Sequence, residues 1–195
     1  MLSGPASVYV DGSFISRSDV PLVSPEESFD CPLGIDPSIR VTYQPLSKKA
    51  TQSGFVTRSS NTTFTQRILL HNTKSIAVDN VKVLDQIPVS EDSIITVKLI
   101  SPPLESTNIP GGTVTSTSSG VENKSGVKVP PPVKVAQGIV AQWDGADDLT
   151  SEDDLSSLGN DGKISWVCSI PSQGKVTLTL QWEVSAPLKT NITGL

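Results

Sequence analysis

Histidine is the side chain that most often moves protons near neutral pH, and this chain has one, His71. A Ser-His-Asp relay would need His71 as its base, together with a serine on a sharp strand-to-helix turn. In the local sequence ILLHNTKS, His71 ends an apolar run beside a turn, and nothing near it resembles that serine motif. The sequence therefore predicts a structural or surface role for His71 and no catalytic residue.

The thiols are equally poor candidates for chemistry. Cys31 and Cys168 are far apart in the sequence, and together with one histidine they do not make a zinc ligand set. Each cysteine alternates in phase with apolar neighbours, so we expect two buried free thiols. Spacing does not exclude a disulfide between Cys31 and Cys168, and that alternative stays open.

Carboxylates gather in the stretch DGADDLTSEDD, Asp144 to Asp154. Calcium favours several carboxylates on one loop, but the acid, glycine and distal glutamate spacing of an EF-hand is absent. We expect a solvated acidic loop there, with calcium as the alternative. Glu91-Asp92 and Asp153-Asp154 are adjacent pairs, and neighbours on an extended chain point in different directions, so paired-carboxylate glycoside hydrolysis has little support.

Two further motifs lack the context that they need. Gly111-Gly112 does not lie between a strand and a helix, so no phosphate cradle is predicted. The sequons at Asn61, Asn123 and Asn191 would accept glycans in a secreted protein, but the N-terminus has no basic-then-apolar signal pattern. We therefore expect no catalytic, cofactor-binding or metal site, no cofactor, and a cytoplasmic protein.

The elements that would position such residues are strands, because apolar residues recur with a period of two. In residues 175–184 one face is apolar and the other polar, and residues 163–170 alternate in the same way. The turn residues PSQG at 171–174 predict that these two runs form an antiparallel hairpin. Asp11-Gly12, between two apolar runs, predicts another hairpin near the start of the chain.

Further strands are expected at 39–43, 62–71, 76–86 and 95–101. Pro88 cannot donate a hydrogen bond to a sheet, so the segment IPVSED should be a corner at which the chain crosses between two sheets. Residues 104–137 are rich in Gly, Ser and Pro and predict a flexible insertion. Residues 138–160 are expected to form an acidic loop or a short helix. Short strands with frequent turns predict one antiparallel sandwich or barrel domain over residues 1–195.

Composition excludes several classes of function. The net charge is −5, and the sequence has no basic stripe of the kind that nucleic-acid binding requires. No run approaches the roughly 18 apolar residues of a transmembrane helix. We therefore expect neither nucleic acid nor membrane as a partner.

Four segments together resemble the C-terminal domain of the mucoidy inhibitor A-like family, a domain of unknown function. They are GPASVYVDGSFI, the run into CPLGID, TFTQRILLHNTKSIAVDNVKVLDQIPVSEDSIITVKL and GKISWVCSIPSQGKVTLTLQWEVSAP. The resemblance leaves out about residues 104 to 160. It implies an all-β, antiparallel, immunoglobulin-like β-sandwich, preceded in other members by a partner domain and a coiled coil. This chain looks like a fragment or a truncated member.

The resemblance names restraint of exopolysaccharide but supplies no reaction and no catalytic residue. We expect a non-catalytic interaction or assembly module that docks a protein partner or its own upstream domains. The alternative is a glycan-binding or glycan-processing domain. Exposed tryptophans would support that alternative. Trp166 and Trp182 lie in phase with core residues, which leaves Trp143 as the free candidate.

Overall fold

The computed structural model describes residues 3–10, 12–31, 33–53, 59–105, 121–122, 128–147, 149, 152–188 and 190. This part of the chain is nearly all β, with antiparallel sheets and one short helix. The chain divides into two compact units, Met1–Ser38 and Ile39–Leu195. Each unit is described by itself, and the single domain expected over residues 1–195 stays a prediction.

The N-terminal unit is built on a two-stranded antiparallel sheet. Strand β1 (Gly4–Val10) pairs with β2 (Ser13–Val20) along its whole length. Gly12 has a φ of +77°, a conformation that glycine adopts without a steric penalty and that tight hairpin turns need. The hairpin predicted from Asp11-Gly12 is confirmed, although Asp11 itself lies outside the described residues.

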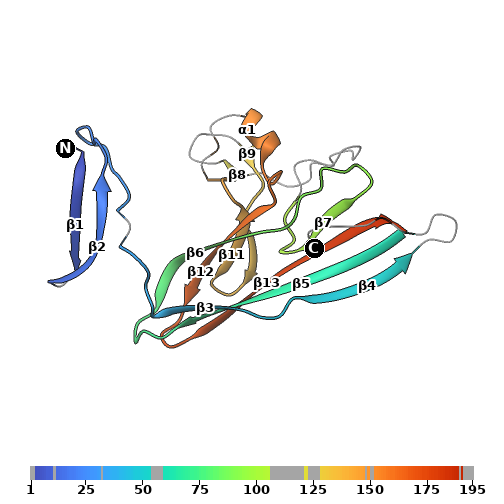
Figure 1. Ribbon diagram of the computed structural model, residues 1–195, viewed down its shortest axis with the longest axis horizontal. Coiled ribbons are helices and arrows are strands. Elements are labelled where there is room, and N and C mark those ends of the chain that lie inside the picture. Colours follow the sequence, from blue (N-terminus) through green and yellow to red (C-terminus); the bar gives the residue numbers. More distant parts are fainter. Residues whose placement is uncertain are drawn as a thin grey trace. The chain divides into compact units, whose positions relative to one another are not determined.

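The larger unit contains two main sheets (Figure 1). One has four strands in the order β10-β11-β12-β6, which are Val133–Ala136, Ile139–Trp143, Lys163–Ile170 and Val78–Gln86. The other has the order β3-β5-β13-β7, which are Ile39–Tyr43, Ser59–Asn72, Lys175–Pro187 and Thr96–Ser101. Strand β4 (Ser47–Ser53) pairs with β5 and is the fifth strand of this sheet. Three smaller elements are β8 (Val121–Glu122), its partner β9 (Lys128–Val129) and the helix α1 (Glu152–Ser157).

Apolar faces of both sheets contribute to one core. From the five-stranded sheet come buried residues such as Ile68, Leu178 and Leu180, and from the four-stranded sheet Ile164 and Trp166. The sheets do not close into a barrel. Of the two expected architectures, the all-β antiparallel sandwich is therefore the one that is confirmed. Trp182 is also buried, as its phase predicts, and its indole stacks on Phe64 with ring centroids 5.4 Å apart.

The hairpin predicted for residues 163–170 and 175–184 is wrong. Strand β12 pairs with β11 and β6, whereas β13 pairs with β5 and β7 in the other sheet. The two runs each have one apolar face, and these faces meet across the core instead of lying side by side. Pro171 to Gly174 therefore links two sheets.

The corner predicted at IPVSED is confirmed. Strand β6 ends at Gln86 in the four-stranded sheet, and β7 begins at Thr96 in the other. Between them Ile87 is buried, and the Ser90 hydroxyl accepts from the backbone N–H of Asp92 at 3.2 Å. The expected inward face beyond the corner is also found, since Ile95, Val97 and Leu99 pack against the core.

The flexible insertion expected at 104–137 is wrong for the segments that are described. Leu104 packs against the core, Val129 is buried in it, and Val133–Ala136 is a strand. Residues 106–120 and 123–127 lie outside the described residues. In 138–160 the short helix is confirmed as α1, but Ile139–Trp143 is a buried strand and not part of an acidic loop. Its short apolar run IVA packs in the sheet between β10 and β12.

Candidate functional site

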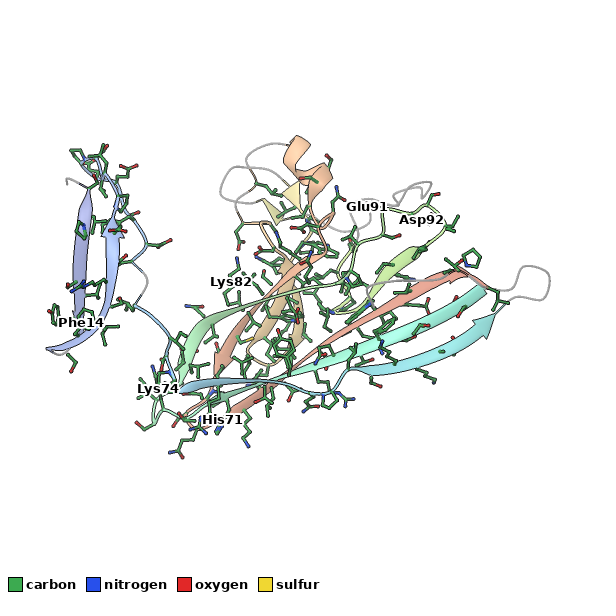
Figure 2. All side chains as sticks on the ribbon, in the orientation of Figure 1. Phe14, His71, Lys74, Lys82, Glu91 and Asp92 are labelled. Carbon is green, nitrogen blue, oxygen red and sulfur yellow. The ribbon has the colours of Figure 1, made fainter. Side chains whose placement is uncertain are left out.

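His71 lies on the outer face of the five-stranded sheet, near one end of β5 (Figure 2). Its neighbour Leu70 is only 1% exposed and points into the core, so by alternation His71 points outward. In register, Arg40 on β3 and Lys175 on β13 lie directly opposite His71 on its two sides. The structure thus places three basic side chains in one row, which we call the basic row.

Carboxylates of the acidic stretch contact residues of their own chain. Asp144 forms an ion pair with Lys82 at 2.9 Å, and Asp147 accepts from the Gln142 side-chain amide at 2.7 Å. Among the described residues no group of three or more His, Cys, Asp or Glu side chains is placed to hold a metal ion. The side chains of Asp148, Asp153 and Asp154 lie outside the described residues, so the absence of a metal site stays a prediction.

The second acidic pair belongs to the corner. Glu91 and Asp92 are exposed, and Asp92 accepts from the backbone N–H of Ile94 at 3.0 Å. This bond closes the turn that leads into β7. The geometry therefore gives Asp92 a structural part in the corner.

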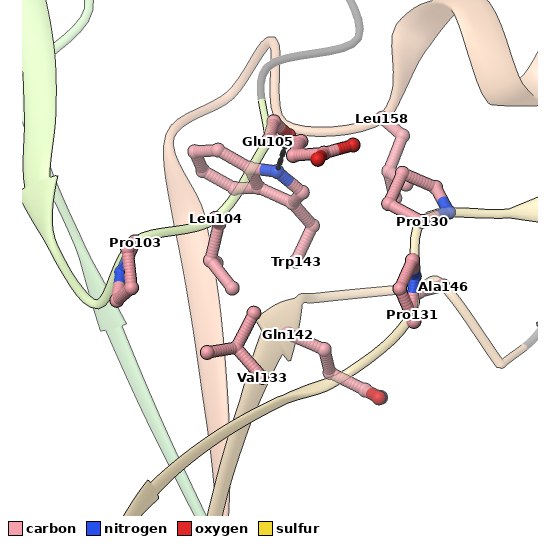
Figure 3. A pocket seen from close by; sticks show the side chains of 10 residues that line it. All are labelled: Pro103, Leu104, Glu105, Pro130, Pro131, Val133, Gln142, Trp143, Ala146 and Leu158. Atoms are coloured by element: carbon pink, nitrogen blue, oxygen red, sulfur yellow. Dashed lines mark hydrogen bonds between the residues drawn. The ribbon is translucent and has the colours of Figure 1, made fainter. Parts of the chain in front are cut away.

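One pocket in the described part of the chain lies at the end of the sandwich (Figure 3). Its lining is mainly apolar and includes Leu104, Pro130, Val133 and Trp143. The Trp143 indole N–H donates to the carbonyl of Glu105 at 2.8 Å. The cavity volume is about 90 Å³. Pockets for small ligands usually measure about 300–1,000 Å³, so this one is smaller than a typical ligand pocket.

Trp143, the tryptophan left free by sequence reasoning, is 7% exposed. All three tryptophans are therefore buried, since Trp166 and Trp182 are 0% and 8% exposed. A stacking platform for sugars needs an exposed aromatic face, and no tryptophan supplies one.

The two thiols differ in their surroundings. Cys168 is buried and free as predicted, and burial raises the pKa of its thiol to about 11. Cys31 is also free but is exposed, so the expectation that it is buried is wrong. Cys31 belongs to the small N-terminal unit, where alternation with Phe29 and Leu33 does not indicate a core, because both of those residues are exposed as well.

An open sheet edge is the feature that sequence reasoning missed. Strand β3 pairs only with β5, so its other side has no partner among the described residues. Val41 and Tyr43 point toward the inside of the sandwich, yet each is 55% exposed. The Tyr43 hydroxyl donates to Asp85 on β6 at 3.4 Å, and partial burial followed by this carboxylate raises the pKa of Tyr43.

The N-terminal unit also exposes apolar side chains. Tyr9 and Phe14 contact each other edge to face, with ring centroids 5.7 Å apart, but they are 61% and 54% exposed. Leu22 is 72% exposed and Ile35 97%. These four side chains are therefore more exposed than buried.

In the part of the chain that the structure describes, no helix has the length and apolar character that a bilayer crossing requires. A curated protein of Caenorhabditis elegans, Protein F37C4.5, is 29% identical to this chain over 102 residues. The match takes in 52% of this chain but 18% of the worm protein. No solved structure matches. A family model described as "Domain of unknown function (DUF4139)" matches residues 2–188, nearly the whole chain, and the chain therefore belongs to the DUF4139 family.

Proposed function

We propose that this domain is a non-catalytic β-sandwich module for protein interaction and assembly. In this proposal it is the C-terminal domain of a larger cytoplasmic protein that resembles the mucoidy inhibitor A-like family. Its partner is another protein or its own upstream domains. The observation that carries the proposal is the apolar surface of the N-terminal unit, in which Tyr9, Phe14, Leu22 and Ile35 are all more than half exposed.

Exposed apolar side chains on a two-stranded sheet are unfavourable in water. An isolated hairpin is marginally stable at best, because it has no second layer to bury its apolar side chains. Covering them removes apolar area from water, which contributes about 25 cal/mol for each Å². A protein surface that covers Tyr9 and Phe14 would therefore stabilise the hairpin and gain affinity from the same contact. The length of the worm relative, most of which lies outside the match, supports a larger protein as the setting.

The alternative hypothesis, a glycan-binding or glycan-processing domain, has less support. Three buried tryptophans leave no indole face for sugar stacking, and the pocket beside Trp143 is too small for a sugar ring with its contacts. Nucleic acid is also a poor fit as a partner, because the chain carries a net charge of −5.

The test is quantitative capture of protein partners from a native lysate with the full-length protein and with this domain alone. The variant Tyr9→Ser/Phe14→Ser should lose the partners that the unaltered protein retains. Ile76→Ser is the matched control, because Ile76 is 65% exposed but lies in the other unit, and it should retain them. The proposal fails if both variants capture the same proteins in the same amounts.

A further inference from the structure

We propose that the free edge of β3 is a docking site for an extended protein segment in which apolar and acidic residues alternate. The inference rests on the proposed role as an interaction module, but it concerns a different surface from the N-terminal hairpin. Its basis is the coincidence, on one strand, of backbone groups without a partner among the described residues, exposed inward-facing apolar side chains and an outward-facing cation.

The backbone of β3 has hydrogen-bonding groups to offer. The N–H of Gln44 donates to the carbonyl of Arg67 at 2.9 Å, just beyond the end of β3. In an antiparallel pair every second residue bonds to the neighbouring strand, so Thr42 and Arg40 bond to β5 in the same way. The N–H and C=O groups of Val41 and Tyr43 therefore point away from β5. An added strand would pair with these groups.

The inward side of the edge is apolar and incompletely covered. On β5 the residues opposite Val41 and Tyr43 are Leu70 and Ile68, which are 1% and 0% exposed. Val41 and Tyr43 are each 55% exposed on the same face. A strand added beside β3 would place its own inward side chains next to them and remove both from water. Every second residue of the docking segment should therefore be apolar.

The outward side selects acidic residues. Arg40 lies at the edge of the basic row, with His71 and Lys175 behind it on the next two strands. Among the described residues, none of these three side chains forms an ion pair or a side-chain hydrogen bond. The whole chain carries a net charge of −5, so this row is a local reversal of sign that would attract carboxylates and repel a basic segment.

The ligand class follows from the backbone pairing. Only a polypeptide repeats N–H and C=O groups at the spacing that pairs with Val41 and Tyr43. Polyanions such as nucleic acids and acidic glycans offer charge to the basic row but cannot extend the sheet. The segment is therefore a protein strand, and its acidic residues face Arg40.

The experiment titrates the protein with a synthetic peptide about eight residues long, within the usual length of a strand, in which Val and Glu alternate. A Val-Lys peptide is the charge control. The Val-Glu peptide should slow amide exchange at Val41 and Tyr43 and bind about fivefold more tightly than the Val-Lys peptide, as expected for exposed cross-strand ion pairs. Arg40→Glu should reverse this preference. Val41→Pro removes a donor and should abolish binding, whereas Leu84→Ala, at an exposed apolar position on β6, should not.

Three results would overturn the inference. In the first, Arg40→Glu leaves the preference for the Val-Glu peptide unchanged. In the second, Val41→Pro keeps the melting temperature of the unaltered protein and binds the peptide equally well. In the third, amide exchange at Val41 slows with protein concentration in the absence of peptide, which would assign the edge to a second copy of this chain. If Val41→Pro does not fold, the effect of Arg40→Glu on the preference between the two peptides tests the inference by itself. Peptide binding does not depend on Tyr9 or Phe14, so failure here is distinguishable from failure of the hairpin in the capture experiment.

Discussion

The side-chain amide of Asn72 donates to the backbone carbonyl of Pro171 at 3.0 Å and so joins the two turns that cross between the sheets. Asn72 ends β5 just before the chain crosses to β6, and Pro171 follows β12 just before the chain crosses to β13. The same amide donates to the backbone carbonyl of Ile76 at 2.8 Å. The side-chain oxygen of Asn72 accepts from the backbone N–H of Lys74 at 2.9 Å. Asn72 is completely buried, and its amide also donates to the carbonyl of the buried Ile170 at 3.3 Å, so it satisfies a backbone group inside the fold.

Replacement of Asn72 should therefore be costly. Asn72→Ala removes the donor to three carbonyls, including that of the buried Ile170, and we expect a loss of about 2–4 kcal/mol in the free energy of unfolding. Asn72→Asp should cost more, because a carboxylate would face the carbonyl oxygens that the amide now binds. Denaturant melts measure both, with Asn160→Ala as the control at an exposed amide. A loss below about 0.5 kcal/mol for Asn72→Ala, the level of an ordinary surface substitution, would contradict this role.

Substitutions at two glycines distinguish the stability cost of backbone strain from that of a steric clash. Gly145 and Gly162 both have positive φ angles, +85° and +71°. A Cβ at Gly145 would meet nothing within 4 Å, but a Cβ at Gly162 would lie 2.5 Å from the carbonyl oxygen of Ile87. We expect Gly145→Ala to cost about 1–2 kcal/mol, the strain of a left-handed alanine, and Gly162→Ala clearly more. Thermal melts of the two variants compare them, and equal losses would refute the steric contribution.

Three truncations around the corner should rank in a fixed order. Ser90→Ala removes turn hydrogen bonds to Asp92 and should cost about 0.5–1.5 kcal/mol. Val97→Ala should cost about 1.5–3 kcal/mol, because it removes methyl groups that pack against the core. Trp182→Ala should cost about 3–5 kcal/mol, since the indole is buried and stacked on Phe64. Denaturant melts give the ranking. A harmless Val97→Ala would show that the inward face of β7 is wrongly assigned.

The Cys168 thiol should resist alkylation in the folded protein. It should also make the free energy of unfolding decrease at high pH. Its pKa is raised to about 11 in the folded protein, against about 8.5 for an unfolded thiol. Between these values the folded state holds one more proton than the unfolded state. The contribution of Cys168 is therefore complete below about pH 8.5 and is lost as the pH rises toward 11, by at most about 1.4 kcal/mol per pH unit.

The corresponding measurement compares denaturant melts from pH 8 to pH 10.5 for the unaltered protein and for Cys168→Ala, which should show a shallower decline. Cys31→Ala is the control and should leave the slope unchanged. At pH 8 iodoacetamide should label Cys31 in the native protein and reach Cys168 only on unfolding, because the thiolate is the reactive form. Rapid native labelling of Cys168 would contradict its burial.

Calcium should not stabilise the protein. The described carboxylates Asp144 and Asp147 already contact Lys82 and Gln142. Melting curves recorded with chelator and with millimolar calcium should overlay, because an ion that bound only the folded state would raise stability by mass action. A calcium-dependent rise in melting temperature would identify the acidic stretch from Asp144 to Asp154 as a metal site.

Local sequence determined several of the strands and their buried faces, although β10 and β11 were not predicted. In β13 the alternation from Val176 to Val184 puts Leu178 and Leu180 in the core, because successive residues of a strand point to opposite faces. The corner at Pro88 could be predicted for a similar reason, since proline cannot donate to a ladder. These features depend on neighbours within a few residues, and the sequence contains those neighbours directly.

Tertiary structure decided which strands pair and therefore where the candidate site lies. The turn from Pro171 to Gly174 is compatible with a hairpin, but β12 and β13 lie in different sheets and both contribute residues to one core. Trp143 and Val129 are buried because distant segments cover them, whereas Cys31, in the small N-terminal unit, is exposed. The open edge at Val41 and Tyr43 follows from strand order, which depends on contacts between residues far apart in the sequence. Period-two alternation alone carries no information about those contacts.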